Sequence, residues 1–214
     1  MAYPDGVTLT GLVGSYIMCP DSAALDLTGD FEVVVRAALT NWKAGTIQSF
    51  LAKFDGPSGS GRAYVARLVA TTGVPQITWN DSGTATVRNL TGIGPAPSFT
   101  NGNAAWMKFE FDANDGAGNA AAFTYTSADQ VGEPSSWSLL GSSSVATTAT
   151  IATGSYPLVI GSDNTATRST AGKFYRVILR NAIGGSVVAD FDSRLSGPTG
   201  YTDAYGNTWT IVGA

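Results

Sequence analysis

The sequence predicts an all-β fold of antiparallel strands, and two observations lead to this prediction. Residues 25–39 place a turn signal, Thr28-Gly29-Asp30, ahead of a segment in which Phe31 and Val33 face one way and Glu32 the other. Alternation with a period of two is typical of a strand that buries one face. The same pattern recurs to the C-terminus with almost no helical periodicity. We therefore expect function on a sheet face or in the loops.

All the strands are predicted in order from the same alternation, with turns rich in Gly, Pro, Asn and Asp between them. They comprise residues 31–39, 49–54, 64–70, 76–79, 84–90, 106–111, 121–126, 158–160, 173–180, 187–191 and 208–212. Residues 91–103 are expected to form a surface loop. The Ser/Thr-rich residues 132–153 have no clear period, and we expect a loop pinned to the body by Trp137, Leu139 and Leu140. So many strands bury their apolar faces only as two packed sheets or as a closed barrel.

Length and composition favour a single domain. A chain of 214 residues with 43% hydrophobic content can bury a core without disulfides, and β-sandwiches often reach this length as one unit. We expect one domain over residues 1–214. Within it, residues 1–24 are a leading segment along a sheet edge and residues 25–212 form the sandwich.

Charge and rare residues exclude several classes of function. The net charge is −4 and no Lys/Arg cluster occurs, which argues against nucleic-acid binding and against attachment to anionic lipid. The chain has no histidine, so Ser-His-Asp catalysis and His-ligated metals are excluded. Cys19 is the single cysteine, which excludes an intrachain disulfide. No secretory signal and no membrane-spanning segment is predicted, so no membrane insertion is expected.

Several segments, in order, resemble the laminin-G-like branch of the concanavalin A-like lectin and glucanase fold. The resemblance lies in the strand around Gly29-Asp30-Phe31, the Lys53-Phe54-Asp55 strand end, the hairpin of residues 106–112 with Gly116, and the closing segments 158–161, 172–177 and 181–183. The ending, residues 188–192 and 206–211, is similar to versions carried by bacteriophage tail or other virion proteins.

The resemblance implies a two-sheet antiparallel jelly-roll sandwich whose relatives bind glycans or proteins, assemble into particles, or cleave polysaccharides. A fold alone does not choose among these functions. We expect a non-enzymatic structural or adhesion protein of a bacteriophage virion, made in the host cytoplasm. Its expected partners are other virion proteins and a host-surface glycan. The small, flat Ala/Gly/Thr-rich segments are also compatible with a homo-oligomer.

The alternative is a polysaccharide hydrolase of the glucanase branch. Glu110, Asp112 and Asp115 are one carboxylate type away from the E-x-D-x-x-E strand motif of the glucanases that share this fold. In those enzymes two glutamates serve as nucleophile and acid/base, and the intervening aspartate tunes their protonation. Asp115 lies among turn residues, which places it poorly for a pair of carboxyl groups about 5–5.5 Å apart. The simpler interpretation is an edge glutamate followed by a polar turn.

Calcium is the one cofactor that the sequence suggests, although none is required. Asp112, Asn114 and Asp115 cluster oxygen atoms in one turn, but they are also ordinary turn residues. Asp163 and Asn164 lie where some laminin-G-like relatives place metal ligands at the rim, and Asp55 is expected near the same rim.

Aromatic residues are the candidate glycan ligands, since sugar rings stack on aromatic faces. Trp42, Trp79, Trp137 and Tyr156 lie at strand ends or in loops, and about two of the four are expected to be buried. The non-core face of several strands carries alternating charges, which is either a recognition surface or a solvated face with cross-strand pairs. These residues are Glu32, Arg36, Arg67, Lys108, Glu110, Arg176, Arg180 and Asp190.

Overall fold

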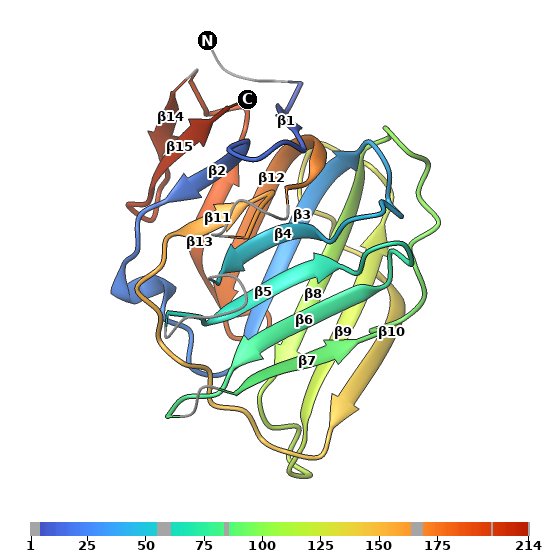
Figure 1. Ribbon diagram of the computed structural model, residues 1–214, viewed down its shortest axis with the longest axis vertical. Coiled ribbons are helices and arrows are strands. Elements are labelled where there is room, and N and C mark those ends of the chain that lie inside the picture. The colour runs from blue at the N-terminus through green and yellow to red at the C-terminus, as the bar shows by residue number, and fades with distance from the viewer. Residues whose placement is uncertain (1–4, 55–60, 84–85, 164–168, 198, 214) are drawn as a thin grey trace.

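The alternating segments form antiparallel strands that pack face to face as two sheets, and together they make a jelly-roll sandwich (Figure 1). The computed structural model describes residues 5–54, 61–83, 86–163, 169–197 and 199–213. The only helical element within these ranges is the short 3-10 turn η1 (Ala23–Leu25). Accordingly, no helix in the described part of the chain has the length and apolar character needed to cross a bilayer.

The seven-stranded sheet has the order β1-β12-β3-β8-β9-β10, and β13 pairs with β12 beyond the end of β1. Its strands are β1 (Val7–Thr10), β3 (Phe31–Leu39), β8 (Ala105–Asp112), β9 (Ala120–Ser127), β10 (Ser138–Val145), β12 (Ala171–Asn181) and β13 (Ser186–Asp192).

The eight-stranded sheet has the order β14-β15-β2-β11-β4-β5-β6-β7 and lies in front of the other sheet in Figure 1. Its strands are β2 (Tyr16–Cys19), β4 (Gln48–Lys53), β5 (Tyr64–Leu68), β6 (Pro75–Asn80), β7 (Val87–Thr91), β11 (Leu158–Ile160), β14 (Gly200–Thr202) and β15 (Thr208–Val212).

Aromatic side chains from both sheets fill the space between them. Phe31 of β3 lies 5.2 Å from Phe111 of β8 and 5.1 Å from Tyr64 of the facing sheet, measured between ring centroids. Trp79 of β6 lies 4.9 Å from Phe111. Large apolar rings contribute most of the buried area in a core of this kind, so these contacts hold the two sheets together.

The leading segment only partly follows the sheet edge. β1 lies at the edge of the seven-stranded sheet, where Val7 pairs with Phe174. β2, however, lies between β11 and β15 inside the eight-stranded sheet. The expectation that the whole segment lies along an edge is therefore wrong for β2. The buried Ile17 and Cys19 give the physical reason, because their side chains pack into the shared core.

The Ser/Thr-rich region contains a strand that the sequence did not predict. β10 forms within residues 132–153 and pairs with β9 as the last strand of its sheet. As an edge strand it leaves many side chains exposed, and a bulge at Leu139/Gly141 interrupts its alternation. Both features erase the periodic signal from which strands are predicted.

The loop after β7 closes this side of the sandwich. The backbone of Gly94 lies so close to Gly141 of β10 that a Cβ on either residue would collide with the other segment. Gly94 also has a φ of +94°, a conformation that favours glycine. The Thr124 hydroxyl donates a hydrogen bond to the carbonyl of Ile93 and ties the same loop to β9. The residues that follow Gly94 are thereby placed next to the ends of β8, β9 and β10.

Residues 128–137, here called the strap, fold back across the outer face of the seven-stranded sheet. The strap backbone accepts a hydrogen bond from Trp106 Nε1 at the Gln130 carbonyl (3.0 Å). Beneath it, Val34, Trp106 and Ile178 form a second apolar cluster, and each is at most 1% exposed. The outer face of this sheet is therefore largely covered, and strand β3 is buried on both sides.

Candidate functional site

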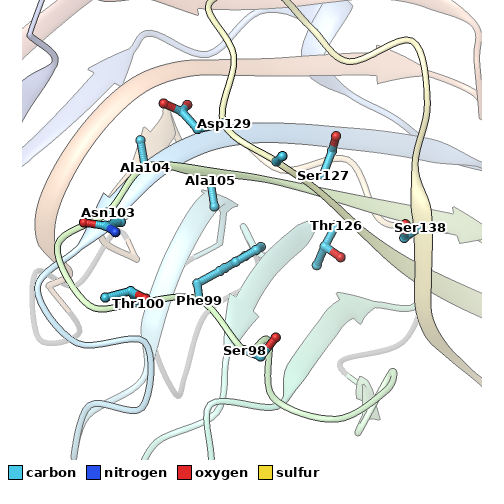
Figure 2. A pocket seen from close by; sticks show the side chains of 11 residues that line it. Ser98, Phe99, Thr100, Asn103, Ala104, Ala105, Thr126, Ser127, Asp129 and Ser138 are labelled. Carbon is cyan, nitrogen blue, oxygen red and sulfur yellow. The ribbon is translucent and has the colours of Figure 1, made fainter.

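A hollow of about 350 Å³ lies where the loop after β7 meets the ends of β8, β9 and β10 (Figure 2). The Phe99 side chain crosses the middle of the view, with Thr126 on one side and Thr100 on the other. Hydroxyl groups and other small polar side chains dominate the lining. The lining residues are Ser98, Phe99, Thr100, Asn103, Ala104, Ala105, Thr126, Ser127, Ala128, Asp129 and Ser138.

The loop wall of the hollow is held firmly by contacts with Trp42 and Leu39. The Phe99 ring meets the Trp42 ring edge-on, with 4.8 Å between centroids. Trp42 also donates its backbone N–H to Oδ1 of Asn101 (3.0 Å), and the Gly102 N–H donates to the Leu39 carbonyl (2.8 Å). These anchors fix the position of Phe99 before any ligand arrives, which lowers the entropic cost of binding.

The strand wall comes from β9, β10 and the start of the strap. Thr126 is paired with both Met107 and Ser138, so the three strands set its position. Asp129 is clamped by Arg36, whose Nε and Nη2 donate to the two carboxylate oxygens at 2.7 and 3.1 Å. Figure 2 shows Asp129 at the rim, away from Phe99. The two-point geometry makes this a directional contact and not a loose surface pair.

The chemistry of the lining suits a ligand rich in hydroxyl groups. Serine and threonine hydroxyls both donate and accept hydrogen bonds, and an asparagine amide does the same. The half-buried Phe99 adds an apolar ring to this polar surface. An apolar ring beside groups of mixed hydrogen-bonding character can bind a molecule that has both C–H faces and hydroxyl edges.

Two of the predicted aromatic ligands lie in the core. Trp42 and Trp79 are 2% and 0% exposed, and both pack against phenylalanines between the sheets. Neither presents a ring face to solvent, which confirms the expectation that about two of the four candidates are buried. The candidate roles of Trp42 and Trp79 as glycan ligands are wrong, because their rings lie in the core. Trp42 comes just after one predicted strand and Trp79 ends another. At the end of a strand the sequence pattern does not reveal whether a side chain faces the interior.

The other two predicted aromatic ligands are half-buried, and neither is among the residues that line the hollow. The Trp137 ring, at the end of the strap, packs edge-on against Trp106, with 6.5 Å between centroids. Lys108 Nζ lies 5.5 Å from the centre of the Trp137 ring. Tyr156 packs against Gly61, where any larger residue would collide with its ring. Their roles as ligand-binding residues stay predictions.

The three carboxylates of the hydrolase alternative have separate partners. Glu110 accepts a hydrogen bond from Lys108 Nζ (2.5 Å) and is 7% exposed. Burial, together with the hydrogen bond and charge of Glu110, raises the pKa of Tyr125 to about 12. Asp112 accepts the N–H of Asn114 within its own turn.

Asp115 stabilises the turn in which it lies. Its carboxylate accepts hydrogen bonds from the Asn119 side chain (2.8 Å) and from the N–H groups of Ala117 and Asn119. These hydrogen bonds lower the pKa of Asp115, the Asn119 side chain contributing most. A general acid needs a raised pKa, so Asp115 is poorly suited to that role.

The predicted calcium ligands are described only in part. Asp163 is 1% exposed at the end of β11, and Asp55 and Asn164 lie outside the described residues. Within the described ranges, no group of three or more Asp, Glu or Cys side chains is arranged to hold a metal ion. The oxygens of Asp112, Asn114 and Asp115 instead accept backbone hydrogen bonds within their turn.

The charged outer face is an ion-pair network beneath and beside the strap. Glu32 lies 2.6 Å from Arg180, and Arg180 also reaches Glu133 of the strap at 2.7 Å. Arg176 pairs with Asp190 at 2.7 Å. Arg67 lies on the other sheet, where it donates to Gln76. With Glu32 and Glu110 less than a tenth exposed, much of this set is covered by the strap and paired, so it is not an open recognition surface.

The hollow itself was missed by reasoning from the sequence. Residues 91–103 were recognised as a surface loop, but none of them was named as a ligand. The available signal is the segment Ser98-Phe99-Thr100-Asn101, an aromatic residue among hydroxyl and amide groups in a loop. Its partners Thr126 of β9 and Ser138 of β10 lie 27 and 39 residues beyond Phe99 in the chain, and only strand pairing brings them together.

Solved structures with this architecture include a carbohydrate-associated domain. The CBM40 domain of the Ruminococcus gnavus IT-sialidase superimposes with a TM-score of 0.51 and 13% identity, covering 81% of this chain and 88% of that one. The same domain bound to α2,3 sialyllactose gives a TM-score of 0.52 and 13% identity over 83% and 90% of the two chains. A weaker match is the enzymatically active domain of tailspike protein 2 from bacteriophage CBA120, with a TM-score of 0.45 and 14% identity over 74% of this chain and 23% of that one.

No protein-family model and no curated protein matches the sequence. At 13% identity, the likeness to the CBM40 domain establishes a shared fold. The chain therefore has the two-sheet jelly-roll architecture of that domain.

Proposed function

We propose that this protein is a non-enzymatic adhesion domain of a bacteriophage virion and that it binds a host-surface glycan in the hollow around Phe99. One observation carries the proposal: a rigidly held aromatic ring lies among hydroxyl and amide groups from two separate walls. A sugar has the same combination of apolar faces and polar edges. The contacts of Trp42 with Phe99 and with the Asn101 side chain hold one wall in place without a ligand.

The fold likeness supports this proposal at the level of architecture. The CBM40 domain has been solved with α2,3 sialyllactose bound, so this arrangement of two sheets can hold a glycan. Which glycan this chain binds, and where, rests on its own residues. They favour the hollow, because Trp42 and Trp79 are buried.

The absence of catalysis is part of the proposal, and it is supported by the hydrogen-bond partners of the candidate carboxylates. Glu110 is engaged by Lys108 and Tyr125, while Asp115 is held in a turn by Asn119. A retaining glycosidase needs two carboxyl groups about 5–5.5 Å apart, one of them protonated. We expect equal inactivity of the wild type and Glu110→Gln on a panel of β-glucans. Release of reducing ends by the wild type alone would establish the hydrolase instead.

Membership of a virion, contact with other virion proteins and assembly of several copies belong to the same proposal. The motivation is the resemblance of residues 188–192 and 206–211 to virion proteins. Mass spectrometry of purified particles tests this part, and particles without the polypeptide would refute it.

Glycan binding is tested on an array of neutral and acidic oligosaccharides with the wild type and Phe99→Ala. We expect Phe99→Ala to weaken binding at least about fivefold, since an aromatic anchor is worth about 1–3 kcal/mol. Phe123→Ala is the matched control, because Phe123 is also a half-buried phenylalanine but lines a different hollow, with Ser142 and Asp115.

The circular dichroism spectrum verifies that both variants are folded. Loss of binding in Phe123→Ala alone would move the site to that second hollow, and binding by neither wild type nor variants would refute glycan recognition. We also propose that no metal is required. Unchanged binding in EDTA is the expected result, and loss of binding would point to calcium.

A further inference from the structure

We infer that the hollow around Phe99 selects neutral sugar residues and discriminates against acidic ones. The inference rests on the proposed function and adds to it the chemical class of the ligand. It comes from the distribution of charge around the hollow and not from the fold.

The hollow has a single charged side chain in its lining, and that charge is negative. Asp129 is the residue concerned, and no lysine or arginine is among the residues that line this part of the described structure. The other polar groups are serine and threonine hydroxyls and the Asn103 amide. Such groups complement sugar hydroxyls, which both donate and accept.

The cation nearest to this carboxylate, Arg36, already forms an ion pair with it. Arg36 binds both oxygens of Asp129, and its guanidinium carbon lies 4.5 Å from the centre of the Tyr175 ring. The Arg36 side chain is only 15% exposed, whereas that of Asp129 is 42% exposed. The side of the pair that a ligand meets is therefore the carboxylate.

A carboxylated or sulfated sugar in the hollow would approach this carboxylate without a free cation to receive it. Two like charges 4 Å apart repel by about 1 kcal/mol in water and by more where water is excluded. The Arg36 guanidinium on the far side of the carboxylate offsets part of this repulsion, so an acidic sugar should bind about two- to fivefold more weakly. A neutral sugar meets no such penalty. The volume of about 350 Å³ is near the lower end of ligand pockets, which is enough for one or two sugar residues of a glycan.

The experiment compares neutral glycans on the array with their sialylated or sulfated counterparts, using the wild type and Asp129→Asn. We expect the wild type to bind neutral members about two- to fivefold more tightly than the matched acidic ones. Asp129→Asn removes the negative charge and releases the Arg36 guanidinium beside the hollow. The ratio of neutral to acidic affinity should therefore fall at least fivefold, whatever happens to the absolute affinity.

Asp112→Asn is the matched control, since it changes the net charge by the same amount outside the hollow. Among the hydrogen bonds described for Asp112, its carboxylate accepts only the N–H of Asn114. This variant should leave the ratio unchanged. Preference of the wild type for acidic glycans, or an unchanged ratio in Asp129→Asn, would overturn the inference while leaving glycan binding intact. Binding of no glycan of either class would overturn the proposed function itself.

Discussion

Lys53 is the most unusual single residue of the molecule, because its side chain is fully buried and charged. Its ammonium lies 2.5 Å from Asp21, 3.0 Å from Asp26 and within hydrogen-bonding distance of the Gly154 carbonyl. The two carboxylates are about one third and one quarter exposed. The ammonium thus depends on these neighbours for nearly all of its solvation, whereas each carboxylate keeps contact with water.

This asymmetry predicts the relative cost of breaking the cluster. The double variant Asp21→Asn/Asp26→Asn leaves a buried ammonium without a counter-charge, and we expect it to lose about 3–5 kcal/mol of unfolding free energy. Lys53→Met leaves two carboxylates that water can reach, and we expect a smaller loss. Urea denaturation measures both. A larger loss in Lys53→Met than in the double variant would contradict this account.

For single residues, the sequence predicted which side chains share a face of a strand, but not which side chains from distant parts of the chain meet in the fold. The alternation of Phe31, Val33 and Glu32 was enough to predict strand β3 and its core face. The pairing of Asp129 with Arg36 joins residues that are 93 positions apart, and nothing in the local pattern indicates it. For the same reason Phe99 was not recognised as a site residue, although its neighbours in sequence are typical of a binding loop.

Among the elements, the strap differs most from what alternation predicts. An antiparallel sheet in a sandwich usually leaves its outer face in water, and the charges along β3, β8 and β12 agreed with that expectation. Here the strap buries Val34, Trp106 and Ile178 from the outside. The strap has no period of its own, so its position is set by Arg36, Arg180 and Trp106 and not by its own propensity.

The attachment of the strap to β12 can be tested separately from the core. Glu133→Gln removes the charge that faces Arg180, a pair whose side chains are 15% and 27% exposed. We expect global stability to fall by at most about 1 kcal/mol, because partly exposed ion pairs contribute little. Cleavage within residues 128–137 by a broad-specificity protease should rise several-fold, since local opening costs less than unfolding.

Asp112→Asn serves as the control for strap opening, because it changes the same charge outside the strap. If cleavage within residues 128–137 stayed at the wild-type rate in Glu133→Gln, the ion pair would not hold the strap. A drop of several kcal/mol in global stability would instead make the strap part of the cooperative core.

For the molecule as a whole, buried aspartates near the C-terminus predict how stability responds to acid. Burial alone would raise the pKa of Asp203, but hydrogen bonds from the N–H of Asp190, from Asn207 and from Trp209 Nε1 outweigh it and lower the pKa below the ordinary 3.8. A carboxyl group with a lowered pKa in the folded state stabilises the protein above its unfolded pKa. That stabilisation is lost as the pH falls toward the folded pKa.

Asp203→Asn should therefore lower the unfolding free energy near neutral pH by about 1–3 kcal/mol, because it weakens several hydrogen bonds to a charged acceptor. The loss of stability between about pH 5 and pH 2 should also become shallower than in the wild type. Urea denaturation at a series of pH values measures both effects. Parallel pH profiles for the two proteins would exclude Asp203 as a source of the acid sensitivity.

The architecture as a whole was the most predictable level. Apolar alternation and turn residues are repeated in nearly every segment, so errors at single positions do not change the prediction of two packed sheets. The exceptions include β2 inside its sheet, β10 at an edge and the short β14, none of which was predicted as a strand; the alternation of β2 and β10 is weak or interrupted. Their places are decided by pairing with distant strands, as the location of the hollow is.

The strand order also determines where a label or a solid support can be attached to the protein without covering the hollow. β1 and the β14–β15 hairpin lie at the same side of the two sheets, while β10 ends the seven-stranded sheet at the opposite side (Figure 1). Five strand spacings, roughly 24 Å, separate β1 from β10. A fluorophore, affinity tag or sensor chip coupled beside β1 would therefore lie at the opposite side from β10, so an immobilised sample keeps the β10 wall of the hollow, with Ser138, open to the solution.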